Sequence, residues 1–309
     1  MAEPDSLPAG TPAFSVIIAA YNDWVSLERC LRSLDGQISA SRFEVVIVDD
    51  GSIVGAPDSV GTVDRNFPLK IVRQMHQGIS AARNLGIQNS RGSLLVFVDA
   101  DGILREDCLE RLERVIDKHP LDNYFQLRLI GDCSGLVGRA EELRLATIQN
   151  HMLQSDGYIR YLNTAGFAIR RVRVDSAAKV FDPAAQRAED TLLLANLMQG
   201  GELPRFVDEA IVQHAIPLSL FACLIKDVRS AYLERTTYGM IAAKGIKFRV
   251  SHRERLSMLR SMWKISARRS IGRSAWFVLA LRQFLRLVML LMTDVTHLQN
   301  GRRVSAKSS

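Results

Sequence analysis

The stretch GSLLVFVDADG, from Gly92 to Gly102, decides the fold of this chain. Its apolar run Leu94–Val98, bounded by glycine and polar residues, is typical of a buried strand. Two carboxylates, Asp99 and Asp101, follow the run directly. A second stretch has the same form, because Phe43–Val48 is also predicted to be a buried strand and is followed by the residues DDGS. The sequence thus predicts two strands that end in acidic residues.

Alternating elements on either side extend this pattern into a sheet. Strands are also predicted at Phe14–Ala20 and Leu69–Val72, and helices at Trp24–Leu34, Ser80–Gln88 and Arg105–Lys118. Near-continuous apolar strands that alternate with helices predict an α/β fold, with a mostly parallel sheet covered on both faces. Ligands of such sheets bind outside the carboxyl ends of the strands. The acidic residues therefore fall where a ligand site is expected.

The pattern is less regular after Tyr124. A strand is predicted at Gly166–Arg170, a helix at Ala188–Gln199 that the two following glycines end, and one or two short strands at Phe206–His214. From Pro217 to about Leu298 the chain is predicted to be mostly helical.

The composition excludes several classes of protein. The chain has 309 residues, of which 47% are hydrophobic, and this is enough for a full core. Its four cysteines are widely spaced, with neither a CxxC motif nor a Cys/His cluster, so we expect free thiols in a reducing compartment. The first residues lack the features of a secretory signal, so a cytoplasmic location is expected. The motifs GxGxxG, GxxxxGK[ST] and GxSxG are absent, which disfavours dehydrogenases, P-loop enzymes and serine hydrolases.

Asp99 and Asp101 are candidate metal ligands. Two carboxylates one residue apart in a loop can converge on one divalent cation, and magnesium or manganese suits oxygen ligands and a diphosphate. The alternative is a plain Asp-Gly turn that caps the next helix.

The pairs Asp49-Asp50 and Glu189-Asp190 are further candidates. A carboxylate of the first pair could accept a hydrogen bond from the N3–H of a pyrimidine base, or the segment could be a turn with Gly51 at positive φ. Glu189 and Asp190 lie at the start of a predicted helix, where negatively charged side chains interact favourably with the helix dipole. Their functional interpretation is a general base that removes a proton from an acceptor hydroxyl.

Six segments in order resemble glycosyltransferase family 2, the inverting nucleotide-sugar enzymes with the GT-A fold. The resemblance covers about Phe14 to Ser219. Its segments are SVIIAAYN (15–22), VIVDDGS (46–52), QGISAARNLGI (77–87), GSLLVFVDADG (92–102), FDPAAQRAED (181–190) and VQHAIPLS (212–219). It implies a metal-dependent transfer of a sugar, with a UDP-sugar favoured as donor, to the hydroxyl of a glycan or lipid-linked acceptor. Polysaccharide or glycolipid biosynthesis is the implied pathway.

On the donor side, the resemblance implies one role for each matching residue. Asp50 resembles the acid that contacts the base, Ala20 and Tyr21 lie on the loop beside the base, and Arg83 and Asn84 match a motif that lies close to the donor.

On the reaction side, Asp99 resembles the acid that holds the donor sugar or ribose, and Asp101 resembles the metal ligand. Asp190 matches the catalytic base, and its neighbour Glu189 is placed among the substrate-binding residues. His214 occupies a position that in some members helps to bind the metal or the diphosphate. A structural histidine is the alternative there.

The sequence departs from the family pattern at three places. Gly102 stands where an acidic residue is common, Gln77 where asparagine is common, and the residues PAA at 183–185 replace a stretch that usually contains an acid. These departures bear on which donor or acceptor fits.

The C-terminal part is basic and ends in an apolar stretch. The net charge of +7 reflects a cluster of basic residues: Lys244, Lys247, Arg249, Arg253, Arg255, Arg260, Lys264, Arg268, Arg269 and Arg273. In the stretch 275–292, Ala275, Arg282, Arg286 and Thr293 share a narrow polar stripe on a helical wheel. This predicts a helix lying in the plane of an anionic membrane surface, at its cytoplasmic face. A helix docked on protein is the alternative.

These observations predict four segments. They are a flexible tail at 1–13, a catalytic domain at 14–219 with a donor half (about 14–120) and an acceptor half (about 121–219), a basic helical extension at 220–298, and a flexible tail at 299–309. Two other functions compete with sugar transfer: a binding or scaffold protein without turnover, and a nucleotidyltransferase. The four matching acids disfavour the first, and the lack of a glycine-rich basic phosphate loop disfavours the second. Nucleic acid is not an expected partner.

Overall fold

A computed structural model describes residues 12–38, 42–57, 60–61, 63–174, 179–214, 219–246, 252–268, 271–285 and 288. The two predicted tails, 1–13 and 299–309, therefore lie almost wholly outside the described residues. So do several of the basic residues noted above, among them Lys247, Arg249 and Arg269.

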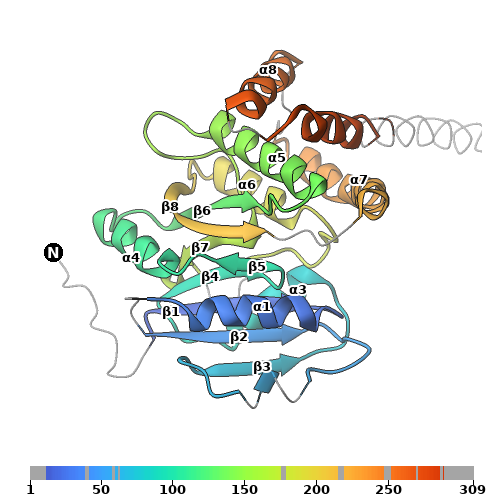
Figure 1. Cartoon of the computed structure of the whole chain (residues 1–309). Helices are drawn as coiled ribbons and strands as arrows, with labels where there is room; N and C mark the ends of the chain where they lie inside the picture. Colours follow the sequence, from blue (N-terminus) through green and yellow to red (C-terminus); the bar gives the residue numbers. More distant parts are fainter. Residues whose placement is uncertain are drawn as a thin grey trace, which may run out of the picture.

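An eight-stranded sheet in the order β3-β2-β1-β4-β7-β6-β8-β5 forms the centre of the molecule (Figure 1). The strands are β1 (Phe14–Ala20), β2 (Phe43–Asp49), β3 (Leu69–Arg73), β4 (Leu94–Asp99), β5 (Gly102–Leu104), β6 (Tyr124–Gly131), β7 (Phe167–Arg170) and β8 (Arg205–His214). Strands β3, β2, β1 and β4 are parallel, as predicted. Strand β7 is antiparallel to both β4 and β6, and β5 is antiparallel to β8, so the second half of the sheet is mixed.

Helices cover both faces of this sheet. They are α1 (Trp24–Asp35), α3 (Ile79–Gln88), α4 (Cys108–Lys118), α5 (Leu136–Met152), α6 (Glu189–Gln199), α7 (Leu220–Ala243) and α8 (His252–Arg268), with short 3-10 turns at Thr164–Gly166 and Arg171–Arg173. Residues 273–285 are helical as well. The predicted elements of the first half are confirmed to within a few residues at their ends.

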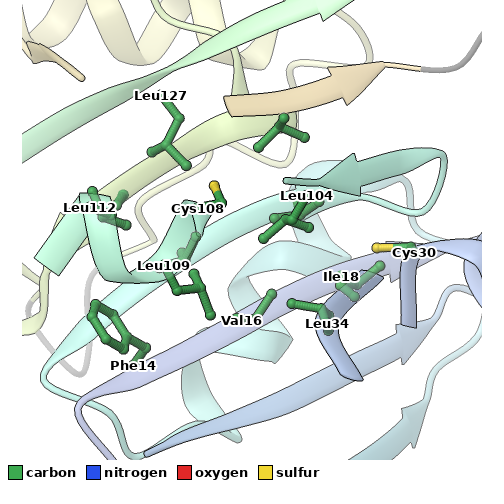
Figure 2. Close-up of a cluster of buried hydrophobic side chains, with 14 of the residues drawn as sticks. Phe14, Val16, Ile18, Cys30, Leu34, Leu104, Cys108, Leu109, Leu112 and Leu127 are labelled. Atoms are coloured by element: carbon green, nitrogen blue, oxygen red, sulfur yellow. The ribbon is translucent and has the colours of Figure 1, made fainter. Parts of the chain in front are cut away.

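Alternate residues of β1 face two separate cores. Val16 and Ile18 pack with residues of α1 and α4 (Figure 2). Ile17 points to the opposite face and packs with Phe97 and Phe181. A strand that is buried on both faces needs apolar residues at every position, which explains the continuous apolar run in the sequence.

The sequence did not predict β5, β6 or α5. Strand β5 is only 3 residues long, and the buried faces of β6 and α5 contain polar residues. Gln149 of α5 donates to the carbonyl of Leu129 at 2.7 Å and accepts from its N–H at 2.9 Å. Glu142 of the same helix accepts from the N–H of Gly131 at 2.8 Å. Such side chains are stable inside because their partners lie on β6. They remove the apolar periodicity by which a helix is recognised in a sequence.

The C-terminal helices pack on the acceptor half. Helix α7 contacts α6, and α8 contacts α5, so they lie at the end of the molecule opposite β3 (Figure 1). The hydroxyl of Thr237 donates to the carbonyl of Arg187 at 2.5 Å, which ties α7 to the segment that precedes α6. Among the helices of the described residues, none has the length and apolar character needed to cross a bilayer.

Helix α3 lies close to β1 because of Gly86. A Cβ atom at this position would lie 2.4 Å from Cγ2 of the buried Ile17. We therefore expect Gly86→Ala to lower the free energy of unfolding by about 1–3 kcal/mol, as overpacking does. Urea unfolding followed by circular dichroism measures the change.

Gly239 supplies the matched control. It also lies in a helix, α7, but nothing lies within 4 Å of a Cβ atom added there. Gly239→Ala should stabilise the protein by about 0.5–1 kcal/mol. Equal effects of the two substitutions would contradict the close approach of α3 to β1.

Candidate active site

The carboxyl ends of β1, β2 and β4 bring several of the predicted site residues close to one another. The register pairs Ala20 of β1 with Asp49 of β2, and Ala19 with Asp99 of β4. Parallel strands in register place their carboxyl ends side by side, so the loops that carry Tyr21, Asp50 and Asp101 begin from neighbouring positions.

Asp99, Asp101 and His214 form a candidate metal centre. One ligand atom from each of the three lies within 4.8 Å of the others, and all three side chains are partly exposed. Nε2 of His214 lies 3.4 Å from Oδ1 of Asp101. Burial raises the pKa of Asp101 above its usual value; Asp99 adds to this shift, and His214 opposes it. A bound cation would relieve the repulsion between the two acids.

Strand β5 places His214 next to the two acids. Immediately after Asp101 the chain turns into β5, where Gly102 pairs with His214 of β8. A Cβ atom on Gly102 would lie 2.8 Å from Cγ1 of Val98, so a larger residue does not fit there without a shift. This gives a steric reason for the glycine at a position where the family often has an acid.

The donor set fits a divalent cation. Two carboxylates and an imidazole provide oxygen and nitrogen ligands, which suit manganese and other divalent first-row metals. Nδ1 of His214 is buried and has no hydrogen-bond partner among the described residues. Within the part of the chain that the structure describes, Nδ1 thus lacks the partner that a structural histidine would have.

The buried guanidinium of Arg83 joins this centre to the second predicted acidic pair. Nη2 of Arg83 donates to Oδ1 of Asp99 at 2.8 Å, and Nη1 donates to Oε1 of Glu189 at 2.5 Å. Burial disfavours the charged guanidinium, but Glu189 and Asp99 outweigh it and hold the pKa of Arg83 above its usual value. Arg83 also lies over the ring of Phe181, 5.5 Å from its centre.

The surroundings of Asp190 disfavour its charged form. Burial, followed by the neighbouring charge of Glu189, raises the pKa of Asp190 to about 7. Its Oδ1 accepts from the N–H of Thr191 at 2.6 Å. Ala188, the residue directly before α6, has a φ of 58°, a left-handed conformation that costs a non-glycine residue energy. Strain of this kind is common where a side chain is held for function.

The carboxylate of Asp50 is bound by the loop between β3 and α3. Oδ1 accepts from the side chain of Gln74 at 2.6 Å and from the N–H of Gln77 at 2.9 Å. Oδ2 accepts from the N–H of Gly78 at 2.9 Å and lies 2.9 Å from Nδ1 of His76. Gly51 has a φ of 77°, as the turn interpretation required. Asp50 thus holds the 74–78 loop, and its contact with a base stays a prediction.

The sequence analysis did not identify His76 as part of the site. Its ring stacks on that of Tyr21, with centres 4.3 Å apart, and both side chains are exposed. The only sequence signal was a histidine directly before the segment QGISAARN, and this is weak on its own.

Asn84 and Ala20 have internal partners. The side-chain amide of Asn84 donates to the carbonyl of Phe181 at 2.7 Å and accepts from its N–H at 3.1 Å. The carbonyl of Ala20 accepts from the N–H of Asp50 at 2.9 Å. These contacts tie α3 to the segment before α6 and β1 to the loop after β2, and direct contact of Asn84 or Ala20 with a donor stays a prediction.

Comparisons with known proteins agree with this geometry. The chain is 36% identical over 107 residues to "Putative glycosyltransferase EpsH" of Bacillus subtilis, which covers 34% of this chain and 30% of that protein. It is 27% identical over 201 residues to "Succinoglycan biosynthesis protein ExoO" of Rhizobium meliloti, which covers 62% of this chain and 57% of that protein. The matched stretches thus span less than two thirds of these relatives' own lengths.

A solved structure supports the fold. The mannosyltransferase PcManGT from Pyrobaculum calidifontis, in complex with GDP-Man and Mn2+, superposes with a TM-score of 0.59 at 17% identity, covering 97% of this chain and 84% of that one. At this identity the likeness shows the fold alone, and it confirms the expected GT-A architecture.

The family model described as glycosyl transferase family 2 matches residues 15–177, which is more than half of the 309 residues. The match includes Asp50, Arg83, Asp99 and Asp101, whereas Asp190 and His214 lie beyond it. With the GT-A fold and the acids at the expected strand ends, the chain belongs to glycosyl transferase family 2.

Proposed function

We propose that this chain is an inverting, metal-dependent glycosyltransferase that moves a sugar from a nucleotide-diphosphate sugar to an acceptor hydroxyl. The observation that carries the proposal is the Arg83 bridge. It links a three-residue metal centre, through Asp99, to the acidic pair that contains Asp190. A metal-bound leaving group and a base on the acceptor are the two requirements of this reaction, and the bridge connects the residues for both.

Asp101 and His214 would hold the cation, and Asp99, whose carboxylate is close to both, would hold the donor sugar or ribose. When bound, manganese or magnesium neutralises charge on the leaving nucleoside diphosphate. The imidazole in the donor set favours manganese, because magnesium prefers oxygen ligands and water.

Asp190 would act on the acceptor. In the proposed step, the Asp190 carboxylate takes the proton of the acceptor hydroxyl, and the hydroxyl oxygen forms a bond to the anomeric carbon. The bond from that carbon to the diphosphate oxygen breaks, and the diphosphate leaves with the electron pair. Attack from the opposite side inverts the configuration. A base with a pKa of about 7 is well matched to this role near neutral pH.

The stacked rings of Tyr21 and His76 would lie beside the nucleotide base. A UDP-sugar is favoured by the resemblance, and the neighbour with bound GDP-Man makes a guanosine donor the alternative. The succinoglycan relative supports polysaccharide biosynthesis as the pathway, with a glycan or lipid-linked acceptor. We assign the catalytic domain to residues 14–219 and the helical extension to 220–298, with α7 packed on α6.

The metal requirement is tested by nucleoside diphosphate release from a panel of UDP- and GDP-sugars. We expect excess chelator to abolish release and manganese to restore it. Asp101→Asn should reduce release at least about 100-fold, because a bound metal contributes several kcal/mol to such reactions. Asp208→Asn, at an exposed acid on β8, is the control and should behave as the wild type. Full turnover in excess chelator would exclude a catalytic metal.

The base is tested by the pH dependence of turnover. Because Asp190 must be deprotonated, kcat should rise with pH to a plateau, with a midpoint near 7. Asp190→Asn should still bind donor in a thermal-shift assay but lose about 10²–10⁴-fold in turnover. Glu189→Gln can still accept a hydrogen bond from Arg83, so its kcat should still rise with pH. If this rise of kcat with pH is lost in Glu189→Gln and kept in Asp190→Asn, the base is Glu189.

The pH dependence of folding stability gives a second test of the raised pKa of Asp190. A folded-state pKa above the usual value of about 4 means that the folded chain holds the proton more tightly, so stability falls as pH rises from about 4 to 7. The melting temperature of Asp190→Asn minus that of the wild type should therefore be larger at pH 8 than at pH 5.

The Arg83 bridge is tested by urea unfolding. Arg83→Met leaves the buried Glu189 carboxylate without its partner, so the free energy of unfolding should fall by about 3–5 kcal/mol. Adding Glu189→Met to that variant should recover part of the loss. Arg32→Met removes an exposed ion pair with Glu28 and should cost less than about 1 kcal/mol. Similar losses from the two arginines would refute the bridge.

A further inference from the structure

The helical stretch 273–285 has one face docked on the protein. Ala275, Val278 and Leu279 are buried there, packed with Leu143 of α5 and Met262 of α8. This face includes Ala275, one end of the polar stripe that the helical wheel predicted.

Arg282 anchors the docked face. Its Nε donates to Oδ2 of Asp227 at 2.6 Å, its Nη2 donates to Oδ1 at 3.1 Å, and its Nη1 lies 3.4 Å from Glu141. The predicted polar stripe, as far as Ala275 and Arg282 carry it, therefore faces the protein. Arg286 and Thr293, the other members, lie outside the described residues. A charged arginine in the apolar part of a membrane would cost free energy. Arg282 does not have this cost, because its charge is paired inside the protein.

The opposite face of the same helix is apolar and exposed. Phe277, Leu281 and Phe284 are 63%, 43% and 61% exposed. Their spacing of four and three residues puts them on one face of the helix. We call these three residues the apolar stripe.

An aromatic cluster joins the apolar stripe to α8. The ring of Trp276 meets that of Phe277 at 5.2 Å and that of Trp263 at 5.8 Å. Trp263 is half exposed, and the guanidinium of Arg273 lies over its ring at 5.8 Å. Tryptophan and arginine beside an apolar surface are typical of segments that lie at a membrane–water interface.

The surrounding charge decides what can cover this surface. Between Glu254 and Asp294 the sequence contains no acidic residue. Arg260, Lys264 and Arg273 are exposed on the two helices. A second copy of the chain would bring the same positive charges against them, and the repulsion disfavours a symmetric contact. An anionic lipid surface neutralises these charges while it covers the apolar side chains.

We propose that the apolar stripe and the flanking basic residues form a docking surface for an anionic membrane. The helix lies in the plane of the lipid headgroups, with Phe277, Leu281 and Phe284 inserted and Arg282 turned back to the protein. The proposal does not depend on the proposed reaction. If both hold, the enzyme works beside lipid-linked acceptors.

Flotation of the full chain with vesicles tests the surface. We expect binding to vesicles of phosphatidylcholine and phosphatidylglycerol in equal parts, little binding to phosphatidylcholine alone, and weaker binding as salt is raised. Phe277→Ser with Phe284→Ser should weaken binding to the anionic vesicles about tenfold or more. Arg260→Gln with Lys264→Gln should weaken it as well and reduce its dependence on salt.

Matched controls distinguish binding through this surface from nonspecific adsorption to vesicles. Leu121→Ser with Val172→Ser removes two exposed apolar residues elsewhere, and Arg32→Gln with Arg114→Gln removes two exposed charges elsewhere. Both pairs should bind vesicles as the wild type does. Nucleoside diphosphate release in solution should be unchanged in the Phe277/Phe284 variant, so loss of docking is distinguishable from loss of activity.

Two results would overturn the proposal. One is a wild-type chain that does not float with anionic vesicles at low salt. The other is a wild-type dimer, seen by light scattering, that the Phe277/Phe284 substitutions convert to a monomer, because the stripe is then covered by a second copy.

Discussion

The arrangement of the site depends on one buried cation, the guanidinium of Arg83. It is almost inaccessible to solvent, and it bonds to Asp99 at the end of β4 and to Glu189 at the start of α6. A buried arginine is tolerated only when carboxylates satisfy it, and buried carboxylates only when a cation does. Each segment therefore constrains the other, and Asp190 is held next to a charge pair that cannot easily rearrange. Helix α3 can present Arg83 in this position because Gly86 lets it lie close to Ile17 of β1.

The first half of the fold was predictable because its strands are buried on both faces. Runs such as Leu94–Val98 leave no other role for so many apolar residues in succession. The second half was not predictable to the same degree. Gln126, in the middle of β6, is fully buried and donates to the carbonyls of Leu127 and Gly166 at 2.9 and 2.8 Å. A polar residue of this kind looks like a surface residue in the sequence, and only the fold supplies its partners.

The candidate site shows the same division. The sequence could offer Asp99, Asp101 and Asp190 as candidates, because acids at strand ends and helix starts are local features, and the family resemblance added His214. The sequence could not show that Glu189 pairs with Arg83, because those residues are far apart in the chain and the pairing is a tertiary contact. Nor could it show that the carboxylate of Asp50 accepts hydrogen bonds from the loop between β3 and α3, or that His76 stacks on Tyr21. Roles that depend on contacts between residues far apart in the chain are those that the sequence alone leaves open.

The C-terminal helix shows why a helical wheel can assign the wrong side to solvent. A wheel places arginine outside by default, because an unpaired buried charge is costly. Here Asp227 and Glu141 pair with Arg282, so the charged side becomes the docked side and three large apolar residues remain exposed. The anchor and the apolar stripe lie on opposite faces of one rigid helix. Any surface that covers the stripe therefore approaches from the side away from α5, and the Arg282 ion pairs set the orientation in which the rest of the protein is held.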